Sequence, residues 1–270
     1  MKELNGKELA GFVKERQAHV VSMLRGRKIT PKLLIIRDSD NPVIAKYVSL
    51  KCRYGADIGV EVEDCVADGA EGVREAILRG NADAGIHGII VQLPLASCDK
   101  SGTDALVSLI SPEKDVDGLS GHGQYDSATA TAINWLLTGY GVELESKKIA
   151  IVGRGRLVGA PLIKMWTNSG YDITIFHHGD DLTKLREHDI IVTATGQPHL
   201  ITDEMVAPGA VIVDAGTASE NGVLMGDVDD TVRERADLGG ITPKIGGVGP
   251  LTVSVLFEDV IAAASKSKAL

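Results

Sequence analysis

A tyrosine and a lysine one helical turn apart are the residues of this sequence best suited to proton chemistry. Tyr47 and Lys51 lie in a segment that begins with Asn41-Pro42, a pair typical of a helix start. Residues four apart project from one face of a helix. Burial lowers the pKa of a lysine toward neutrality, which allows it to act as a general base. Tyrosine and lysine at this spacing are more often simple surface neighbours, so the pair alone does not establish a catalytic site.

Amide and carboxylate side chains occur further along, at positions where α/β proteins bind ligands. Gln92 ends an apolar stretch that starts at Gly88, and the carboxyl ends of such strands border the ligand sites of open α/β sheets. Asp115 and Asp117 lie in one tight turn, where aspartate is otherwise a routine turn former. The glycine-dense segment 246–250 suits either a plain loop before a helix or the close approach of the backbone to a flat ligand.

A glycine-rich loop with two arginines follows the apolar stretch 148–152. Its glycines form a G-x-G-x-x-x-G pattern, one residue longer than the usual dinucleotide fingerprint. Glycines let the backbone approach a pyrophosphate, and the N-terminus of the next helix supplies free N–H groups. The strand before the loop and the helix after it favour a nucleotide site over a turn that only packs a strand against a helix. The candidate cofactor residues are Gly153, Arg154, Gly155, Arg156, Val158 and Gly159.

The end of the next predicted strand, which usually separates NAD from NADP binding, leaves this preference open. Residues 177–181 are two histidines, a glycine and two aspartates. An acidic residue here favours the ribose hydroxyls of NAD, and a cation favours the phosphate of NADP. The aspartates equally suit the N-cap of a helix over 182–187. His177 is a candidate contact to the adenosine half, and Thr195 and Gly216, which follow the next two strands, complete the predicted cofactor set.

The elements that carry these residues alternate between helices and strands. Apolar residues recur at helical intervals from Leu9 to Leu24, and short apolar runs with polar flanks predict strands. This alternation indicates mostly parallel sheet covered by helices on both faces. The further predicted helices are 42–54 (stopped by Gly55), 71–78, 133–137 and 252–264, and the predicted strands are 32–37, 58–62, 86–91, 148–152, 172–176, 189–192 and 211–214.

The sequence therefore predicts two α/β domains flanking a cleft, the second a Rossmann-like nucleotide-binding domain. A length of 270 residues fits two domains. The stretch 118–127, which contains glycine, serine and histidine, is the predicted boundary, so that the first domain covers 1–122 and the second covers 123–251.

Charge and composition exclude several classes of function. Lys plus Arg total 28 and Asp plus Glu total 37, a formal net charge of −9, whereas general nucleic-acid binding needs cations to neutralise phosphates. No run of about 18 apolar residues predicts a membrane span, and the N-terminus lacks the apolar core of a signal peptide. Three cysteines without C-x-x-C spacing, and histidines without ligand spacing, predict no metal site. We expect a cytoplasmic protein, because this cysteine usage suits a reducing compartment.

Five segments occur in the order and spacing of one known family. From about residue 4 to residue 262, the sequence resembles the bifunctional methylenetetrahydrofolate dehydrogenase/cyclohydrolase family. That family is usually a homodimer, and its C-terminal helix, here 252–270, completes the first domain. The five segments are Tyr47-Val48-x-x-Lys51, Gly88-(x)3-Gln92-Leu93-Pro94-Leu95, Lys114-Asp115-Val116-Asp117-Gly118, Val158-Gly159-x-Pro161 and Gly246-Gly247-Val248-Gly249-Pro250-x-Thr252.

The resemblance implies two successive reactions on one folate. The family oxidises 5,10-methylenetetrahydrofolate by hydride transfer to NADP, or to NAD in some members, and hydrolyses the methenyl product to 10-formyltetrahydrofolate. Lys51 matches its catalytic lysine, Tyr47 the tyrosine beside it and Gln92 the glutamine that positions the lysine. Tyr47 and Gln92 also belong to the implied substrate site. Asp117 matches the aspartate that binds the pterin ring, and Pro250 the loop that borders folate and nicotinamide.

The sequence departs from the family mainly in its nucleotide half. The segment after Gly118 is shorter than usual and retains only Thr129 of a Pro-Cys-Thr-Pro turn. Gly155 stands where the family usually has a serine, which removes a hydroxyl that can bind the cofactor. Residues 178–179 are histidine and glycine where serine and a cation are usual, which weakens an NADP phosphate site. Ile245 stands where proline is usual.

These departures leave three alternatives to the bifunctional enzyme. One is a cyclohydrolase with weak or NAD-dependent dehydrogenase activity, and the second is a non-catalytic paralogue that binds folate or nucleotide. The third is an amino-acid or shikimate-type dehydrogenase on a similar fold, which explains the glycine loop but not the segments around Gln92 and Asp117.

Overall fold

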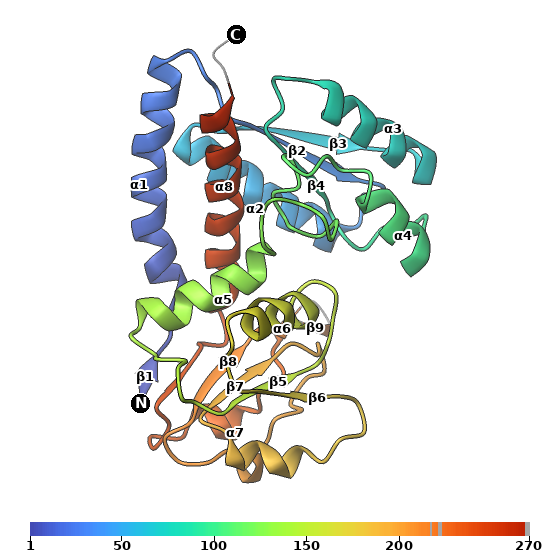
Figure 1. Ribbon diagram of the computed structural model, residues 1–270. Helices are drawn as coiled ribbons and strands as arrows, with labels where there is room; N and C mark the ends of the chain where they lie inside the picture. The colour runs from blue at the N-terminus through green and yellow to red at the C-terminus, as the bar shows by residue number, and fades with distance from the viewer. Residues whose placement is uncertain (217, 221–222, 268–270) are drawn as a thin grey trace. The chain divides into compact units, whose positions relative to one another are not determined.

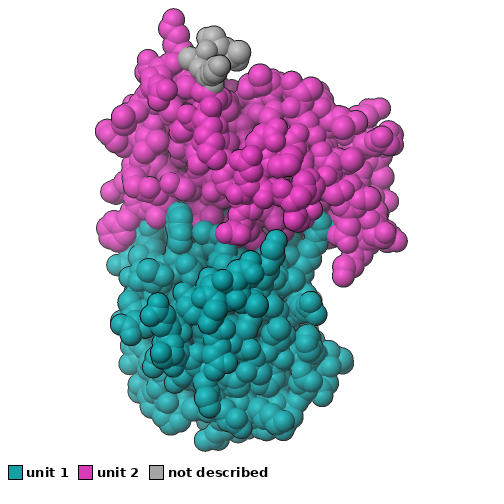
Figure 2. Space-filling view, viewed as in Figure 1, with its two compact units in different colours: residues 1–10, 129–252 teal, residues 11–128, 253–270 magenta. Residues whose placement is uncertain are grey.

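The computed structural model describes residues 1–216, 218–220 and 223–267, which form two compact α/β units (Figures 1 and 2). The predicted fold class, α/β with parallel sheets, is confirmed. Both units are discontinuous in sequence: unit 1 comprises residues 1–10 and 129–252, and unit 2 comprises residues 11–128 and 253–270. Residues 217, 221–222 and 268–270 of the predicted domains lie outside the described residues.

The predicted first domain differs from unit 2 at the start of the chain. Lys2–Glu3 form a short strand, β1, that pairs in parallel with Gly240–Ile241 of unit 1. The backbone N–H of Leu4 also donates to the carbonyl of Ile241 at 2.8 Å. These pairings assign the first ten residues to unit 1, and no local pattern in so short a strand predicts them.

A three-stranded parallel sheet, in the order β3-β2-β4, forms the centre of unit 2. In the central strand Leu33, Leu34, Ile35 and Ile36 are all fully buried, because helices cover both faces of the sheet. Leu34 and Ile36 share one core with α3 and α4. The elements are α1 (Gly6–Gly26), β2 (Lys32–Arg37), α2 (Pro42–Ile58), β3 (Glu61–Val66), α3 (Gly69–Ala82), β4 (Gly88–Val91), α4 (Lys100–Val107) and α8 (Val248–Lys266).

Helix α2, which carries Tyr47 and Lys51, ends later than its glycines predict. Asn41 caps its N-terminus as expected, and its left-handed end is Gly59, with a φ of 84°. Gly55 is instead buried within the helix, where a Cβ would lie 2.5 Å from a side-chain atom of β3. The predicted helix end at Gly55 is therefore wrong, because this glycine lies inside the helix and permits its close packing on the strand. The predicted strand bounds 58–62 are wrong for the same reason, since α2 continues to Ile58 and β3 begins at Glu61.

Helix α8 begins at Val248, before the predicted start at Thr252. By length and composition it is apolar enough to cross a membrane, and half of that stretch is buried inside the structure. Its packing explains this composition, because apolar residues of α8 contact the rest of the structure: the Phe257 ring lies 5.1 Å from the Tyr54 ring of α2. The Tyr54 hydroxyl also donates to Ser254 Oγ at 3.0 Å.

A six-stranded parallel sheet, in the order β1-β11-β8-β7-β5-β6, forms the centre of unit 1. Because β5 pairs with β6 on one side and β7 on the other, the chain changes direction across the sheet at β5. Ligands bind outside the carboxyl ends of strands at such switch points. The remaining elements are α5 (Ala128–Gly139), β5 (Ile149–Val152), α6 (Gly159–Asn168), β6 (Ile173–Phe176), β7 (Ile190–Thr193), β8 (Val211–Asp214), β9 (Ala218–Glu220), β10 (Val223–Met225), α7 (Asp230–Arg233), β11 (Gly240–Ile241), and two 3-10 helices, η1 (Leu182–Glu187) and η2 (Asp203–Met205).

Candidate active site

Lys51 is half-buried on α2, and its ammonium group is directly bound to Gln92. Lys51 Nζ donates a hydrogen bond to Gln92 Oε1 at 2.8 Å. Burial lowers the pKa of the Lys51 ammonium from its usual value, while the nearby Asp117 carboxylate acts in the opposite direction. This lowered pKa has the direction that a general base requires. Unit 2 thus brings together Lys51, Gln92 and Asp117, three of the residues singled out from the sequence.

Backbone contacts hold Gln92 and Asp117 in this arrangement. The backbone N–H of Gln92 donates to the carbonyl of Ile36 at 2.8 Å, so β2 fixes the residue that follows β4. Asp115 is fully buried and accepts hydrogen bonds from two backbone N–H groups just after the acidic turn, at 2.9 and 3.3 Å. Of the two turn aspartates, Asp115 therefore stabilises the turn, and Asp117 is the one whose charge acts on Lys51.

Tyr47 and Pro250 have different surroundings. Tyr47 lies one turn before Lys51 on α2 and is 38% exposed, so its ring is accessible for stacking on a flat ligand. Pro250 lies in the first turn of α8, in the part of that helix that belongs to unit 1.

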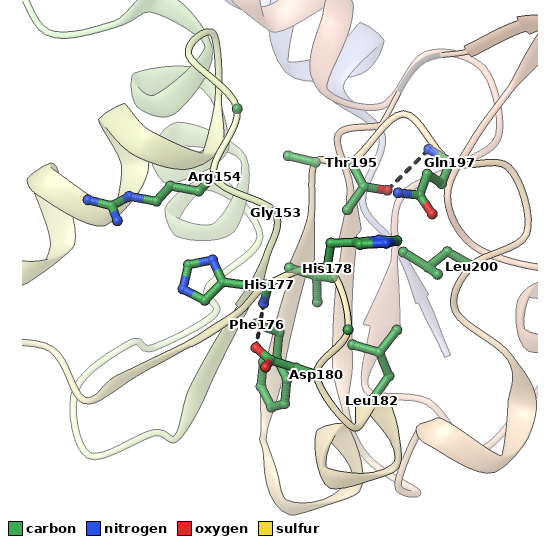
Figure 3. Close-up of a pocket in the computed structure, with 14 residues that line it drawn as sticks. Gly153, Arg154, Phe176, His177, His178, Asp180, Leu182, Thr195, Gln197 and Leu200 are labelled. Carbon is green, nitrogen blue, oxygen red and sulfur yellow. Dashed lines mark hydrogen bonds between the residues drawn. The ribbon is translucent and has the colours of Figure 1, made fainter.

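A cavity of about 280 Å³ lies at the carboxyl ends of β5, β6 and β7 in unit 1 (Figure 3). Gly153, Arg154, Gly155, His177 and Thr195 of the predicted cofactor set line it. Arg156, Val158, Gly159 and Gly216 of that set do not. Gln197 and Leu200 also line the cavity but were missed by the sequence analysis, because the loop after β7 has no recognisable motif.

The three loop glycines have different structural roles. Gly153 has a φ of 96°, and a Cβ there would lie 2.9 Å from the Ala194 carbonyl oxygen. A Cβ on Gly159 would overlap the Gly153 carbonyl, so α6 can begin against the end of β5 only without a side chain. At Gly155 the nearest atom to a Cβ would be 3.7 Å away. Packing therefore does not require glycine at 155, and the space left there fits the close approach of a phosphate group.

The ionisable residues that line the cavity are Arg154, His177, His178 and Asp180. Figure 3 shows the His177 ring on the side of Arg154 and the His178 ring beside the loop that follows β7. Asp180 Oδ2 accepts the backbone N–H of His177 at 2.6 Å, which fixes the end of β6. Asp181 accepts a backbone N–H of η1 at 3.1 Å, so the helix-cap interpretation holds for this residue, although the helix is 3-10.

No group of three or more His, Cys, Asp or Glu side chains that could hold a metal ion occurs among residues 1–216, 218–220 and 223–267.

Comparisons with known proteins cover almost the whole chain. Two family models match: "Tetrahydrofolate dehydrogenase/cyclohydrolase, catalytic domain" over residues 4–117, and its "NAD(P)-binding domain" over residues 127–268. The chain is 38% identical over 278 residues to "Bifunctional protein FolD" of Lactobacillus helveticus, with 96% of each chain covered. The crystal structure of bifunctional FolD from Campylobacter jejuni is 30% identical, with a TM-score of 0.91 over 98% of this chain and 99% of that one. The Trypanosoma brucei FolD complexed with NADP and an inhibitor is 30% identical, with a TM-score of 0.89 over 97% of each chain.

Proposed function

Because the chain belongs to the tetrahydrofolate dehydrogenase/cyclohydrolase family, we propose that it oxidises 5,10-methylenetetrahydrofolate to the 5,10-methenyl form with NADP, and hydrolyses that product to 10-formyltetrahydrofolate. The observation that carries this proposal is the half-buried Lys51, bound to Gln92 and close to Asp117, with a lowered pKa. The same arrangement disfavours a non-catalytic paralogue, because a binding protein has no need of a lysine with a perturbed pKa.

The oxidation step needs a site without a fixed positive charge beside the reacting carbon. Hydride leaves a carbon that is bonded to two nitrogens, and the product is a delocalised cation. Lys51, with its pKa lowered by burial, can be neutral at this stage. Asp117 offers carboxylate oxygens to the amino and ring N–H groups of the pterin, and Tyr47 offers an accessible ring to its face.

The hydrolysis step needs a base, which Lys51 supplies. Water attacks the methenyl carbon and passes a proton to Lys51 Nζ, whose new charge is stabilised by Asp117. The bond from the carbon to N5 then breaks as the hydroxyl on that carbon loses its proton and N5 takes one up, so the carbon keeps the oxygen as a formyl group. One proton is released overall. Gln92 orients Nζ by accepting one of its hydrogen bonds.

The cavity at the carboxyl ends of β5 to β7 is the site that fits the dinucleotide. When bound, NADP supplies the hydride acceptor for the oxidation. Gly153 and Gly155 bring the backbone to the cavity, and Arg154 provides a cation beside it. NAD is the alternative acceptor, because His178 and Gly179 carry no permanent positive charge at the end of β6.

Parallel assays with purified protein test this proposal. Methylenetetrahydrofolate oxidation is measured with NADP and with NAD, and methenyl hydrolysis is measured separately. We expect both reactions, with faster oxidation when NADP is supplied. Hydrolysis without oxidation would indicate that the altered nucleotide loop has abolished the first step. Folded protein that performs neither reaction would contradict the proposal.

We also propose that the protein is a cytoplasmic homodimer. The family resemblance supports the dimer, and the three cysteines, Cys52, Cys65 and Cys98, are all free thiols, which suits a reducing compartment. Light scattering should give twice the mass of the chain, and cell fractionation should recover the protein with cytoplasmic markers. A monomeric mass would contradict the first expectation, and recovery in a membrane or secreted fraction would contradict the second.

A further inference from the structure

A buried carboxylate in unit 1 holds the wall of the cofactor cavity from behind. Asp227 is fully buried, and its Oδ2 accepts hydrogen bonds from Thr193 Oγ1 and from the backbone N–H of Thr195, each at 2.7 Å. Thr193 is the last residue of β7, and Thr195 lines the cavity. One carboxylate oxygen therefore fixes the point at which the chain leaves the sheet and enters the cavity wall.

The backbone of the same residue holds the other end of this loop. The carbonyl of Asp227 accepts the N–H of Ile201 at 2.9 Å. Gln197 and Leu200, which line the cavity, lie between the two attachment points. Asp227 thus closes the loop 195–201 at both ends, through its side chain at one and its carbonyl at the other.

A second carboxylate, at the end of β8, holds Asp227 itself. Asp214 Oδ1 accepts the N–H of Asp227 at 3.1 Å, and Asp214 Oδ2 accepts the N–H of Val228 at 3.2 Å and a hydrogen bond from Arg233. A Cβ on Gly216 would overlap the Asp227 carboxylate, so this position needs glycine to make room for the carboxylate. Gly216 does not line the cavity described above, so this packing role lies behind the cavity wall.

We propose that Asp227 is a positioning residue for dinucleotide binding. Its carboxylate keeps the loop 195–201 in the conformation that the cofactor needs, without touching the cofactor. This inference rests on the proposed function, since it takes the dinucleotide as the ligand of the cavity. Hydrogen bonds to a charged acceptor are stronger than those to a neutral one, so a negative charge at this position stabilises both donors.

The variant Asp227→Asn tests this role, because it keeps the shape of the side chain and removes the charge. We expect the Kd and the KM for NADP to rise about tenfold, equivalent to about 1.4 kcal/mol, because weaker hydrogen bonds let the loop leave the binding conformation and the apparent Kd rises as that population falls. The kcat at saturating NADP and the KM for methylenetetrahydrofolate should stay within about twofold of the original. Binding is measured directly by calorimetry with NADP alone, and oxidation kinetics provide the separation of KM from kcat.

The matched control is Asp189→Asn at the opposite, amino end of β7. Asp189 Oδ2 accepts the backbone N–H of Lys148 at 2.9 Å, so this variant also replaces a carboxylate that binds a backbone donor of the same sheet. We expect no change in the Kd for NADP. An equal rise in both variants would show a general loss of stability and would overturn the positioning role.

A second pair of variants decides the question if Asp227→Asn does not fold. Thr193→Val removes the hydroxyl that Asp227 binds, and Thr193→Ser keeps it. The Kd should rise several-fold with valine and return toward the original value with serine. Unchanged NADP binding in Asp227→Asn, or equal binding in the two Thr193 variants, would overturn the inference. A protein that binds NADP but turns over no folate would contradict the proposed function alone, and the calorimetric comparison would still test Asp227.

Discussion

The candidate sites of the two units are built differently: the site of unit 2 depends on side chains, and the cavity of unit 1 depends on the backbone. In unit 2 the site depends on side chains whose charges are tuned by burial, with Lys51 bound to Gln92 and influenced by Asp117. In unit 1 the cavity depends on backbone shape, because three glycines border it and buried carboxylates hold its wall from outside. Proton transfer needs a side chain with an adjusted pKa, whereas a large anionic ligand needs N–H groups and space. Catalysis in unit 2 should therefore respond most to the loss of the charge of Lys51. Cofactor binding in unit 1 should respond to a change of shape at the glycines and to the loss of the carboxylate charge behind the cavity wall.

The largest effect is expected from Lys51→Met, which removes the charge centre of unit 2 without a large change in volume. Methenyl hydrolysis should fall by about 10²- to 10⁴-fold, the usual contribution of a general base. The Kd for NADP should not change, since the cavity of unit 1 contains no part of α2. The control is Lys46→Met, an exposed lysine on the same helix, which should retain hydrolysis. Full hydrolysis by folded Lys51→Met would contradict the role of Lys51 as the general base of unit 2.

A shape change in unit 1 should have the next largest effect. In Gly159→Ala the new Cβ overlaps the Gly153 carbonyl, and two backbone segments must separate to admit it. We expect the free energy of unfolding to fall by about 1–3 kcal/mol, as for other overpacked sites, and NADP binding to weaken. Urea denaturation and calorimetry measure the two effects. Gly11→Ala is the control, because it adds a methyl group at an exposed position of helix α1 with nothing within 4 Å. Equal stability losses in both variants would contradict the packing argument.

A smaller and more selective effect is expected from Gly155→Ala. The nearest atom to the new methyl group is 3.7 Å away, so the free energy of unfolding should change by less than about 0.5 kcal/mol. The Kd for NADP should nevertheless rise several-fold, because the methyl group occupies space beside the cavity that the phosphate needs. Denaturation and calorimetry on the same sample separate the two quantities. Unchanged binding would show that the phosphate does not approach residue 155.

The smallest effect concerns the acidic surroundings of the unit 2 site. Burial and the nearby Glu258, Asp126 and Asp117 raise the pKa of Asp259 to about 7. The folded state therefore binds the proton of the Asp259 carboxyl group more tightly than the unfolded state does. The stability that this proton contributes is lost as the pH rises from about 4 to about 7. Asp259→Asn should stabilise the protein by on the order of 1 kcal/mol near pH 8 and by less than half as much near pH 5. Urea midpoints at the two pH values test this, and equal midpoint shifts at both would contradict the raised pKa.

Local patterns allowed much of this architecture to be predicted from the sequence. The apolar run 32–37 coincides with β2, and the spacing of Tyr47 and Lys51 placed both on α2. Local patterns placed Gln92 at a strand end and Asp117 in a turn, and the expectation that Gln92 positions Lys51 came from the family resemblance.

The features that sequence reasoning missed all depend on tertiary contacts. Gly55 has the type of a helix terminator, yet it serves the packing of α2 on β3, and only the position of the neighbouring strand shows this. The space that Gly216 leaves for the Asp227 carboxylate is a second feature that only tertiary contacts show. Asp227 itself is separated in sequence from Thr193 and Thr195, and a lone aspartate in a loop carries no signal of such partners.

The pairing of β1 with β11 bears on how the chain folds as it leaves the ribosome. Lys2–Glu3 emerge early, but Gly240–Ile241, their partner, is translated after every other strand of that sheet. Unit 2 likewise needs residues from 253 onward, which are translated later still. Domains usually fold in order from the N-terminus during synthesis, and here neither unit has all of its residues until the last part of the chain is made. Until residues 253 onward are made, unit 2 lacks the C-terminal helix segment that belongs to it.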